Sequence, residues 1–127
     1  MYLALVGSRE FDDYDFFKKE VDSFIKKKRI KKELVIVSGG ARGADRLAER
    51  YANEQGYSLI VLHADWENDG KLAGFKRNVD IVGMSDYILA FWDTFSAGTK
   101  HTIDTAKEFN KNITVVEVPY VPKNICF

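Results

Sequence analysis

The sequence alternates short apolar runs with segments whose apolar residues recur at the period of an α-helix. Each change of period coincides with Gly, Asn, Asp or Ser, which commonly end regular structure. Five runs predict strands, at Tyr2 to Val6, Leu34 to Ser38, Ser58 to Leu62, Tyr87 to Phe91 and Thr114 to Val118. Nearly all are continuously apolar, as is typical of strands buried on both faces of a parallel sheet.

The segments between these strands predict helices with one apolar face. Two further helices are expected from about Leu72 to Val82 and from about Thr99 to Phe109. The inward residues are Phe17, Val21, Phe24 and Ile25, then Ala44, Leu47, Ala48, Tyr51 and Ala52, and finally Ile103 and Ala106. A strand and helix alternation of this kind favours one α/β domain over residues 1–127, with a Rossmann-like five-stranded parallel sheet and helices on both faces.

Composition narrows the choice of partner. Nineteen Lys and Arg balance nineteen Asp and Glu, so no net field attracts long nucleic acid or an anionic membrane. Nucleic acid is therefore a less favoured partner than a small molecule, and a homodimer is left open. We expect a cytoplasmic protein, because no leader or membrane span is recognisable. Two His and the single Cys126 disfavour a zinc-type centre, so no metal or cofactor is expected, although a carboxylate site stays open.

The loops that follow the predicted strands carry the candidate functional residues. In an open α/β sheet, ligands bind beyond the carboxyl ends of the strands, where strand order reverses. The four loops are Gly7-Ser8-Arg9, Ser38-Gly39-Gly40-Ala41-Arg42-Gly43-Ala44-Asp45, His63-Ala64-Asp65-Trp66, and Trp92-Asp93 through Gly98-Thr99.

The Gly-rich loop predicts an anion site. Gly39, Gly40 and Gly43 lack side chains at a strand-to-helix turn, so backbone amides and the positive helix end are accessible to a phosphate. The loop is neither a Walker loop nor a dinucleotide fingerprint. The alternative interpretation is a tight turn in which Asp45 caps the helix.

Two neighbouring loops extend this candidate site. Ser8 and Arg9 offer a hydroxyl and a guanidinium to phosphate oxygens, and Gly98-Thr99 opens a helix whose N-terminus favours anions. A surface loop and a simple Thr99 helix cap are the corresponding structural alternatives.

Taken together, these motifs resemble the SLOG superfamily, and most closely its YspA/YpsA-related branch. The resemblance covers about Leu3 to Ala106 and includes Gly70-Lys71 and Arg77-Asn78. It implies a Rossmann-like fold that binds nucleotides or their derivatives; relatives include the LOG cytokinin-activating phosphoribohydrolases and the single-strand DNA-binding DprA proteins. It also implies that Arg77 contacts phosphate or sugar.

The sequence departs from the LOG pattern near residues 91–102. The Pro-Gly-Gly of LOG enzymes is absent, and Thr102 stands where their glutamate would be. Cleavage of an N-glycosidic bond needs a carboxyl group, which threonine does not supply. Asp93 and Asp65 are the candidate replacements, with Arg77 beside them and Glu67 and Asp69 behind them. Each acid also fits the role of a solvated loop residue or a cap.

The remaining candidates have strong structural alternatives. Trp66 is a candidate for base stacking, whereas packing is favoured for Trp92. Lys71, at the start of a predicted helix, is a candidate phosphate contact, and a solvated surface lysine is an equal alternative. The basic run from Lys26 to Lys32 is interpreted as the end of the first helix. His63 and His101 receive no catalytic role, and Tyr120 to Phe127 is expected to be a tail packed on the surface.

The leading hypothesis is therefore the binding of a nucleotide or nucleotide-derived phosphate ligand, for sensing or sequestering. The first alternative is a LOG-like nucleotide N-glycosidase. The second is DprA-like binding of single-stranded nucleic acid.

Overall fold

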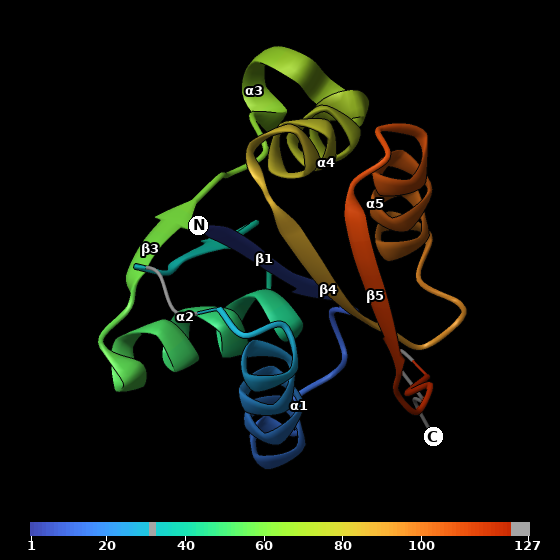
Figure 1. The fold of residues 1–127 in the computed structure, drawn as a ribbon. Coiled ribbons are helices and arrows are strands. Elements are labelled where there is room, and N and C mark those ends of the chain that lie inside the picture. Colours follow the sequence, from blue (N-terminus) through green and yellow to red (C-terminus); the bar gives the residue numbers. More distant parts are fainter. Residues whose placement is uncertain (31–32, 123–127) are drawn as a thin grey trace.

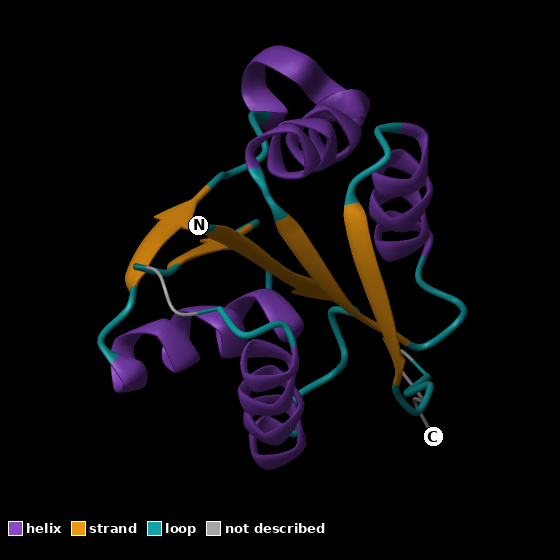
Figure 2. Cartoon of the chain, in the orientation of Figure 1, coloured by secondary structure: helices purple, strands orange, loops and turns teal. Residues whose placement is uncertain are grey.

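The computed structural model describes residues 1–30 and 33–122 and contains a five-stranded parallel sheet with helices on both faces. The strands are β1 (Tyr2–Gly7), β2 (Val35–Ser38), β3 (Ser58–Val61), β4 (Tyr87–Trp92) and β5 (Asn112–Glu117). The helices are α1 (Tyr14–Lys27), α2 (Ala44–Gln55), α3 (Trp66–Asp69), the 3-10 turn η1 (Gly70–Leu72), α4 (Ala73–Met84) and α5 (Ala97–Glu108). The predicted Rossmann-like α/β class is confirmed (Figure 2).

Strand order fixes where a ligand site is expected. The order is β3-β2-β1-β4-β5, so the chain moves outward from β1 in one direction and returns to the other side of β1 at β4. Figure 1 shows α1 and α2 on one face of the sheet and α4 and α5 on the other. The loops after β1 and β4 therefore diverge toward opposite faces and leave a crevice between them, which is the usual site in such sheets.

Side-chain alternation along the central strands divides the core into two halves. On β1, Leu3 and Leu5 pack with α1 and α2, whereas Ala4 and Val6 pack with α4 and α5. This follows from the two-residue period of a strand, which sends successive side chains to opposite faces. The small Ala4 and Ala90 face the same side, where Ile81, Val82, Ile103 and Ala106 complete the core.

The edge strands depart from the sequence prediction. β3 and β5 are half-buried, because each has a neighbour on one side only, and so they are not buried on both faces. Their bounds shift accordingly: β5 runs from Asn112 to Glu117, two residues earlier at its start than predicted. Leu34 and Leu62 lie outside β2 and β3, while Gly7 and Trp92 extend β1 and β4.

The third crossover also differs from the prediction. One helix was expected from Leu72 to Val82, but α3 and η1 precede α4. Asp65 starts α3 by accepting a hydrogen bond from the Asn68 amide at 3.2 Å, a local cap that hydrophobic periodicity does not reveal. Gly70 has a φ of +56°, which ends this first turn. The fourth crossover helix begins at Ala97 rather than Thr99.

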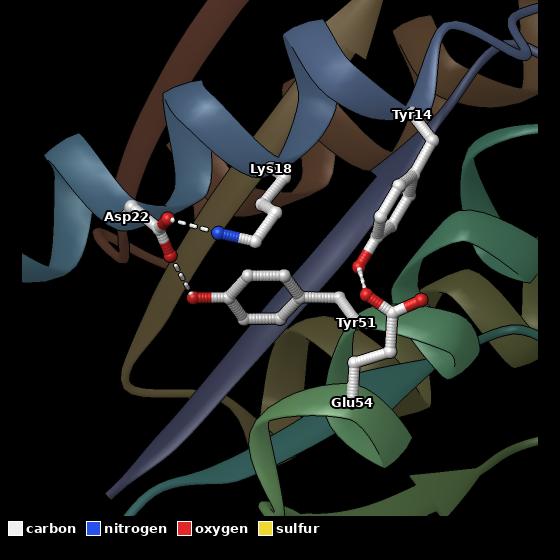
Figure 3. Close-up of polar contacts among 5 residues, drawn as sticks. All are labelled: Tyr14, Lys18, Asp22, Tyr51 and Glu54. Carbon is white, nitrogen blue, oxygen red and sulfur yellow. Dashed lines mark hydrogen bonds and ion pairs between the residues drawn. The ribbon is translucent and has the colours of Figure 1, made fainter.

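A polar network joins α1 to α2 on the first face of the sheet (Figure 3). The hydroxyl of Tyr51 donates to Asp22 at 2.6 Å, and the hydroxyl of Tyr14 donates to Glu54 at 2.9 Å. Lys18 pairs with the second oxygen of Asp22 at 3.0 Å. Glu54 likewise accepts from Arg50 at 2.7 Å, so each carboxylate has one partner on the other helix and one on the preceding turn of its own helix, which fixes how α1 and α2 pack together.

Two predicted features lie partly outside the described residues. Lys26 and Lys27 occupy the last turn of α1, as expected, but Lys31 and Lys32 are not described. In the predicted tail, Tyr120 and Val121 are about half exposed, and residues 123–127 are not described. Over the described ranges, no helix is long and apolar enough to cross a membrane.

Candidate phosphate-binding site

A cavity of about 310 Å³ lies at the carboxyl ends of β1 and β4. It is bounded by the β1–α1 loop, the β2–α2 loop, α4 and the first turn of α5. The lining residues are Val6, Gly7, Arg9, Glu10, Ala41, Asp45, Arg77, Asn78, Ile81, Ser96, Ala97, Gly98, Thr99 and Thr102. Topology and sequence thus agree on the position of the candidate site.

Arg77 crosses the cavity from α4 to the Gly-rich loop. Its Nη1 donates to the carbonyl oxygen of Gly39 at 2.5 Å, and its Nε donates to Oδ1 of Asn78 at 3.1 Å. A Cβ at Gly39 would lie 2.8 Å from Nη1, so glycine is needed for this approach. Both hydrogen-bond acceptors are neutral, so these two bonds do not neutralise the guanidinium charge.

Arg9 brings a second positive charge to the same cavity. Burial lowers the pKa of Arg77 below its ordinary value, and the charge of Arg9 lowers it further, whereas Asp45 opposes the shift. No ion pair within 4.0 Å joins Arg9 or Arg77 to a carboxylate in the described part of the chain. Two guanidinium groups therefore face one cavity without a paired acid.

Asp45 is a buried acid of the lining whose charge interacts with both arginines. Its side chain is 7% exposed, and Oδ2 accepts a hydrogen bond from the amide of Ala41 at 3.1 Å. Burial raises the pKa of Asp45 to about 6, against the lowering influence of the Ala41 amide and of Arg77. The carboxyl group is therefore protonated more readily than an ordinary aspartate, which reduces its repulsion toward an anion at mildly acidic pH.

The N-terminus of α5 faces the cavity without a side-chain cap. Ser96 is its N-cap residue, but the Ser96 hydroxyl donates to Asp93 and contacts the Ser8 hydroxyl at 3.1 Å instead of accepting from the helix. The amides at the start of a helix need external partners and carry a partial positive charge. Ala97, Gly98 and Thr99 therefore present a second anion-attracting element beside the two arginines.

The Gly-rich loop contributes less directly than the sequence suggested. The amide of Gly40 donates to the Ser38 hydroxyl at 3.2 Å, and the amide of Ala41 is held by Asp45. Gly43, with a φ of +75°, precedes α2 and packs against the backbone of Ser8 and Arg9. The loop thus supplies shape and an anchor for Arg77, whereas its Gly40 and Ala41 amides already have partners. Asp45 does not cap α2, because Gly43 occupies the N-cap position.

Asp93 organises the loop rather than lining the cavity. One of its oxygens accepts from the amides of Phe95 and Ser96 at 2.9 and 2.7 Å, and the other accepts from the Ser96 hydroxyl. Burial opposes its ionisation, but the amide bonds outweigh burial and hold its pKa below the ordinary value. Asp93 is therefore an ionised structural group in this arrangement.

Several predicted site residues lie away from the cavity. Asp65, Trp66 and Lys71 lie on the exposed α3 and η1 segment, and Trp66 is 55% exposed. The hydrogen bond of Asp65 with the Asn68 side chain holds its pKa below the ordinary value. Arg42 pairs with Glu10 at the rim, at 2.6 Å. Trp92 packs against the core, as favoured from the sequence, and donates to the Ser96 carbonyl.

The structure adds residues that sequence reasoning did not select. Glu10, Ser96 and Ala97 line the cavity because they adjoin the selected Arg9 and Gly98. Asn78 was selected, and its amide group donates to the Gly98 carbonyl at 3.3 Å, which links α4 to α5. Thr102 also lines the cavity, with its hydroxyl bonded to the Gly98 carbonyl. Threonine brings no acid to the cavity.

Comparison with known proteins gives this cavity a family context. A model of the YspA, cpYpsA-related SLOG family matches residues 1–68, which include β1, the Gly-rich loop and β3. The chain belongs to this family. The matched segment includes the lining residues Gly7, Arg9, Ala41 and Asp45. Arg77 and the lining residues of α5 lie beyond it.

One relative and two solved structures place the family match in context. The Gene 61 protein of Mycobacterium phage D29 is 44% identical over 81 residues, 59% of this chain and 65% of that protein. DNA processing protein A (DprA) of Streptococcus pneumoniae has a TM-score of 0.70 at 22% identity, over 98% of this chain and 51% of its own. DprA of Helicobacter pylori, described in a single-stranded DNA binding mode, has a TM-score of 0.64 at 20% identity, over 98% and 66%. At these identities, the structural likeness shows the fold. This chain spans less than two thirds of each of the three proteins.

Potential metal ligands are sparse in this region. Within residues 1–30 and 33–122, no three side chains of His, Cys, Asp or Glu are grouped closely enough to hold a metal ion. The chemistry offered by the cavity is that of two guanidinium groups, helix amides and one buried carboxyl group.

Proposed function

We propose that the chain is a single ligand-binding domain that holds a nucleotide or nucleotide-derived molecule by its phosphate. The observation that carries the proposal is the convergence of Arg9, Arg77 and the uncapped start of α5 on one cavity. Guanidinium groups bind phosphate oxygens with short, charge-assisted hydrogen bonds. Neither arginine has a paired carboxylate in the described residues, so an anion would satisfy both.

The size of the cavity supports a small ligand. A volume of about 310 Å³ is at the lower end of the range for small-molecule sites. The chain has no net charge, so attraction to a long polyanion would come from this local cluster alone. A mononucleotide, or the terminal phosphate of a larger derivative, fits these conditions.

A second candidate is single-stranded nucleic acid. The DprA of Helicobacter pylori, described in a single-stranded DNA binding mode, shares the fold and supports this alternative. The same cavity would then hold one phosphate of a strand. The basic residues Lys26 and Lys27 lie at the end of α1, toward the start of β2, so they would not extend that contact surface. The affinity for single-stranded nucleic acid should therefore depend only weakly on the length of the nucleic acid.

The N-glycosidase alternative has no specific observation in its favour. Both oxygens of Asp93 are engaged in the β4–α5 loop, and Asp65 caps α3 outside the cavity. Asp45 is the remaining acid in the lining apart from Glu10, whose oxygen pairs with Arg42. Binding rather than turnover is the function that we advance.

Isothermal titration calorimetry with adenosine monophosphate, ADP-ribose and a short oligodeoxynucleotide tests the proposal. We expect saturable binding of at least one mononucleotide-type ligand, weakened by Arg9→Ala and by Arg77→Ala. Arg9 is exposed, so its removal leaves the fold intact even if Arg77→Ala does not. Binding of the oligodeoxynucleotide alone would favour the second candidate. Folded protein that binds none of the three would contradict the proposal.

A further inference from the structure

The most exposed large apolar side chain of the described residues belongs to Phe95, in the loop that leads into the lining of the candidate site. Phe95 is 68% exposed, and its ring centroid is 4.4 Å from that of Tyr120, which is 50% exposed. The two residues come from the β4–α5 loop and from the segment after β5, which run side by side in Figure 1. They form an aromatic pair that is exposed to solvent.

The loop that carries Phe95 is held in place despite its exposure. Thr94 has a φ of +70°, a left-handed conformation that is unfavourable for a β-branched residue. Asp93 holds the next two amides, of Phe95 and Ser96, with hydrogen bonds at 2.9 and 2.7 Å. Trp92 fixes the carbonyl of Ser96 from the other side at 3.1 Å. Buried polar contacts therefore keep an unfavourable turn that directs an apolar ring outward.

The same turn leads directly into the cavity lining. Ser96, the residue after Phe95, lines the cavity together with the first turn of α5. An anion bound at this helix start would thus lie close in the chain to the exposed ring. Aromatic side chains next to a phosphate site are suited to bases, because every nucleobase has a flat face that stacks on such rings.

We propose that Phe95 and Tyr120 form a nucleobase platform for the ligand whose phosphate occupies the cavity. This inference rests on the proposed function and specifies its ligand class as one that carries a base. It replaces Trp66, the stacking residue expected from the sequence. The indole of Trp66 lies over Gly74 on α4 and is not adjacent in the chain to any lining residue, whereas Phe95 directly precedes Ser96 of the lining.

A rival aromatic pair, Phe75 and His101, lies next to the lining residue Asn78. Phe75 is 45% exposed, and its ring centroid is 4.5 Å from that of His101, which contacts Asn78 of the lining. This pair joins two helices, α4 and α5, and so has a packing role of its own. Phe95 and Tyr120 join two loop segments, and Phe95 is more exposed.

Calorimetric titrations of adenosine monophosphate, ribose 5-phosphate and inorganic phosphate test the platform. We expect the wild-type chain to bind adenosine monophosphate more tightly than ribose 5-phosphate. Phe95→Ala should weaken adenosine monophosphate binding by roughly 5-fold to 100-fold, the range for loss of one base–aromatic stack, and Tyr120→Ala should weaken it less. Neither variant should change the affinity for ribose 5-phosphate. Phe109→Ala, at the far end of α5 and 46% exposed, is the matched control and should leave all affinities unchanged.

The outcomes separate this inference from the function on which it rests. Equal affinities of the wild type for adenosine monophosphate and ribose 5-phosphate would overturn the platform and leave the phosphate site standing. Loss of affinity in Phe75→Ala but not in Phe95→Ala would also overturn it. Absence of binding to every phosphate compound would overturn both. An oligodeoxynucleotide arm identifies the source of the base: a Phe95→Ala loss confined to that arm supports a base carried by a strand, and a loss with adenosine monophosphate supports a free nucleotide.

Discussion

The α1–α2 interface and the cavity at the carboxyl edge of the sheet both contain clusters of charged and hydroxyl groups. The two clusters differ in how many of these groups have hydrogen-bond or ion-pair partners within the chain. At the interface, Asp22 accepts from Tyr51 and Lys18, and Glu54 accepts from Tyr14 and Arg50. Burial and then the Glu54 hydrogen bond raise the pKa of Tyr14 to about 12. Figure 3 shows hydroxyl groups and carboxylates directed at one another across the two helices.

At the cavity, neither Arg9 nor Arg77 forms an ion pair within 4.0 Å in the described residues, and the single buried acid of the lining, Asp45, opposes two positive charges. Arg77 donates to a carbonyl and an amide oxygen, and the start of α5 lacks a side-chain cap. A hydrogen-bond network that is complete within the chain is explained by its contribution to stability. A concave cluster with two arginines, a free helix start and one buried acid is suited to an external anion. This difference predicts that substitutions at the α1–α2 interface will mainly lower the free energy of unfolding. Substitution of the arginines at the cavity will mainly weaken ligand binding.

The largest expected effect is on binding at Arg77. Arg77→Ala should weaken phosphate-ligand affinity by about 100-fold, because it removes charge-assisted hydrogen bonds worth about 3 kcal/mol. Arg50→Ala is the matched control, since Arg50 pairs with Glu54 at the α1–α2 interface. Its affinity should equal that of the wild type in calorimetry. Similar losses in both variants would remove the distinction between the regions.

Asp45→Asn should alter the pH dependence of stability. The pKa of Asp45 in the folded chain is raised to about 6, so its folded form retains the proton more strongly than the unfolded chain does. Its contribution to the free energy of unfolding is therefore present below about pH 4 and lost as pH rises through about 6, a change of up to about 3 kcal/mol.

Urea unfolding of both proteins between pH 4 and 8 measures this effect. The variant lacks the titrating group, so its stability relative to the wild type should increase across that interval. Other carboxyl groups, such as Asp93, titrate in both proteins and cancel in the difference. A flat difference would show that Asp45 is not protonated more strongly in the folded chain.

Tyr51→Phe should reduce stability without affecting the ligand. It removes a buried hydroxyl that donates to Asp22 at 2.6 Å, with an expected cost of about 1.5–2 kcal/mol in chemical unfolding. The phenyl ring preserves the packing against Phe17 and Tyr57. A loss of ligand affinity in a fully folded variant would argue against a purely structural role for the interface.

The smallest effect is expected at the cavity rim. Arg42 was selected from the sequence, but it is exposed and pairs with Glu10. Arg42→Ala should change stability by less than about 0.5 kcal/mol, as is usual for exposed ion pairs. Ligand affinity should change by less than about twofold, an effect well below about 1 kcal/mol. A loss approaching that of Arg77→Ala would include Arg42 in the site.

Sequence periodicity predicted the fold well because the central strands and amphipathic helices carry strong patterns. It failed at α3, where a local Asp65 cap starts a helix of four residues, too short to show a period. It also overstated the burial of β3 and β5, since strand order, and hence which strands lie at the edges, is a property of tertiary contacts.

The sequence predicted the location of the candidate site better than its chemistry. Gly39, Gly40 and Gly43 indicated an anion loop, but pairing of the Gly40 and Ala41 amides depends on how Ser38 and Asp45 fold back onto them. The Phe95–Tyr120 contact joins residues from two different loops, so no local pattern could reveal it. Trp66 was a candidate for stacking, with packing as an equal alternative, and it lies on α3, outside the cavity lining.

Amide-proton NMR spectra of nitrogen-labelled protein, recorded during titration with adenosine monophosphate, test the central claim most directly. The account predicts saturable shifts in the amides of Ala97, Gly98 and Thr99 and in those near Arg9, with little change around Tyr51 and Asp22. Shifts confined to the α1–α2 interface, or no saturable shift at the start of α5 for folded protein, would contradict it.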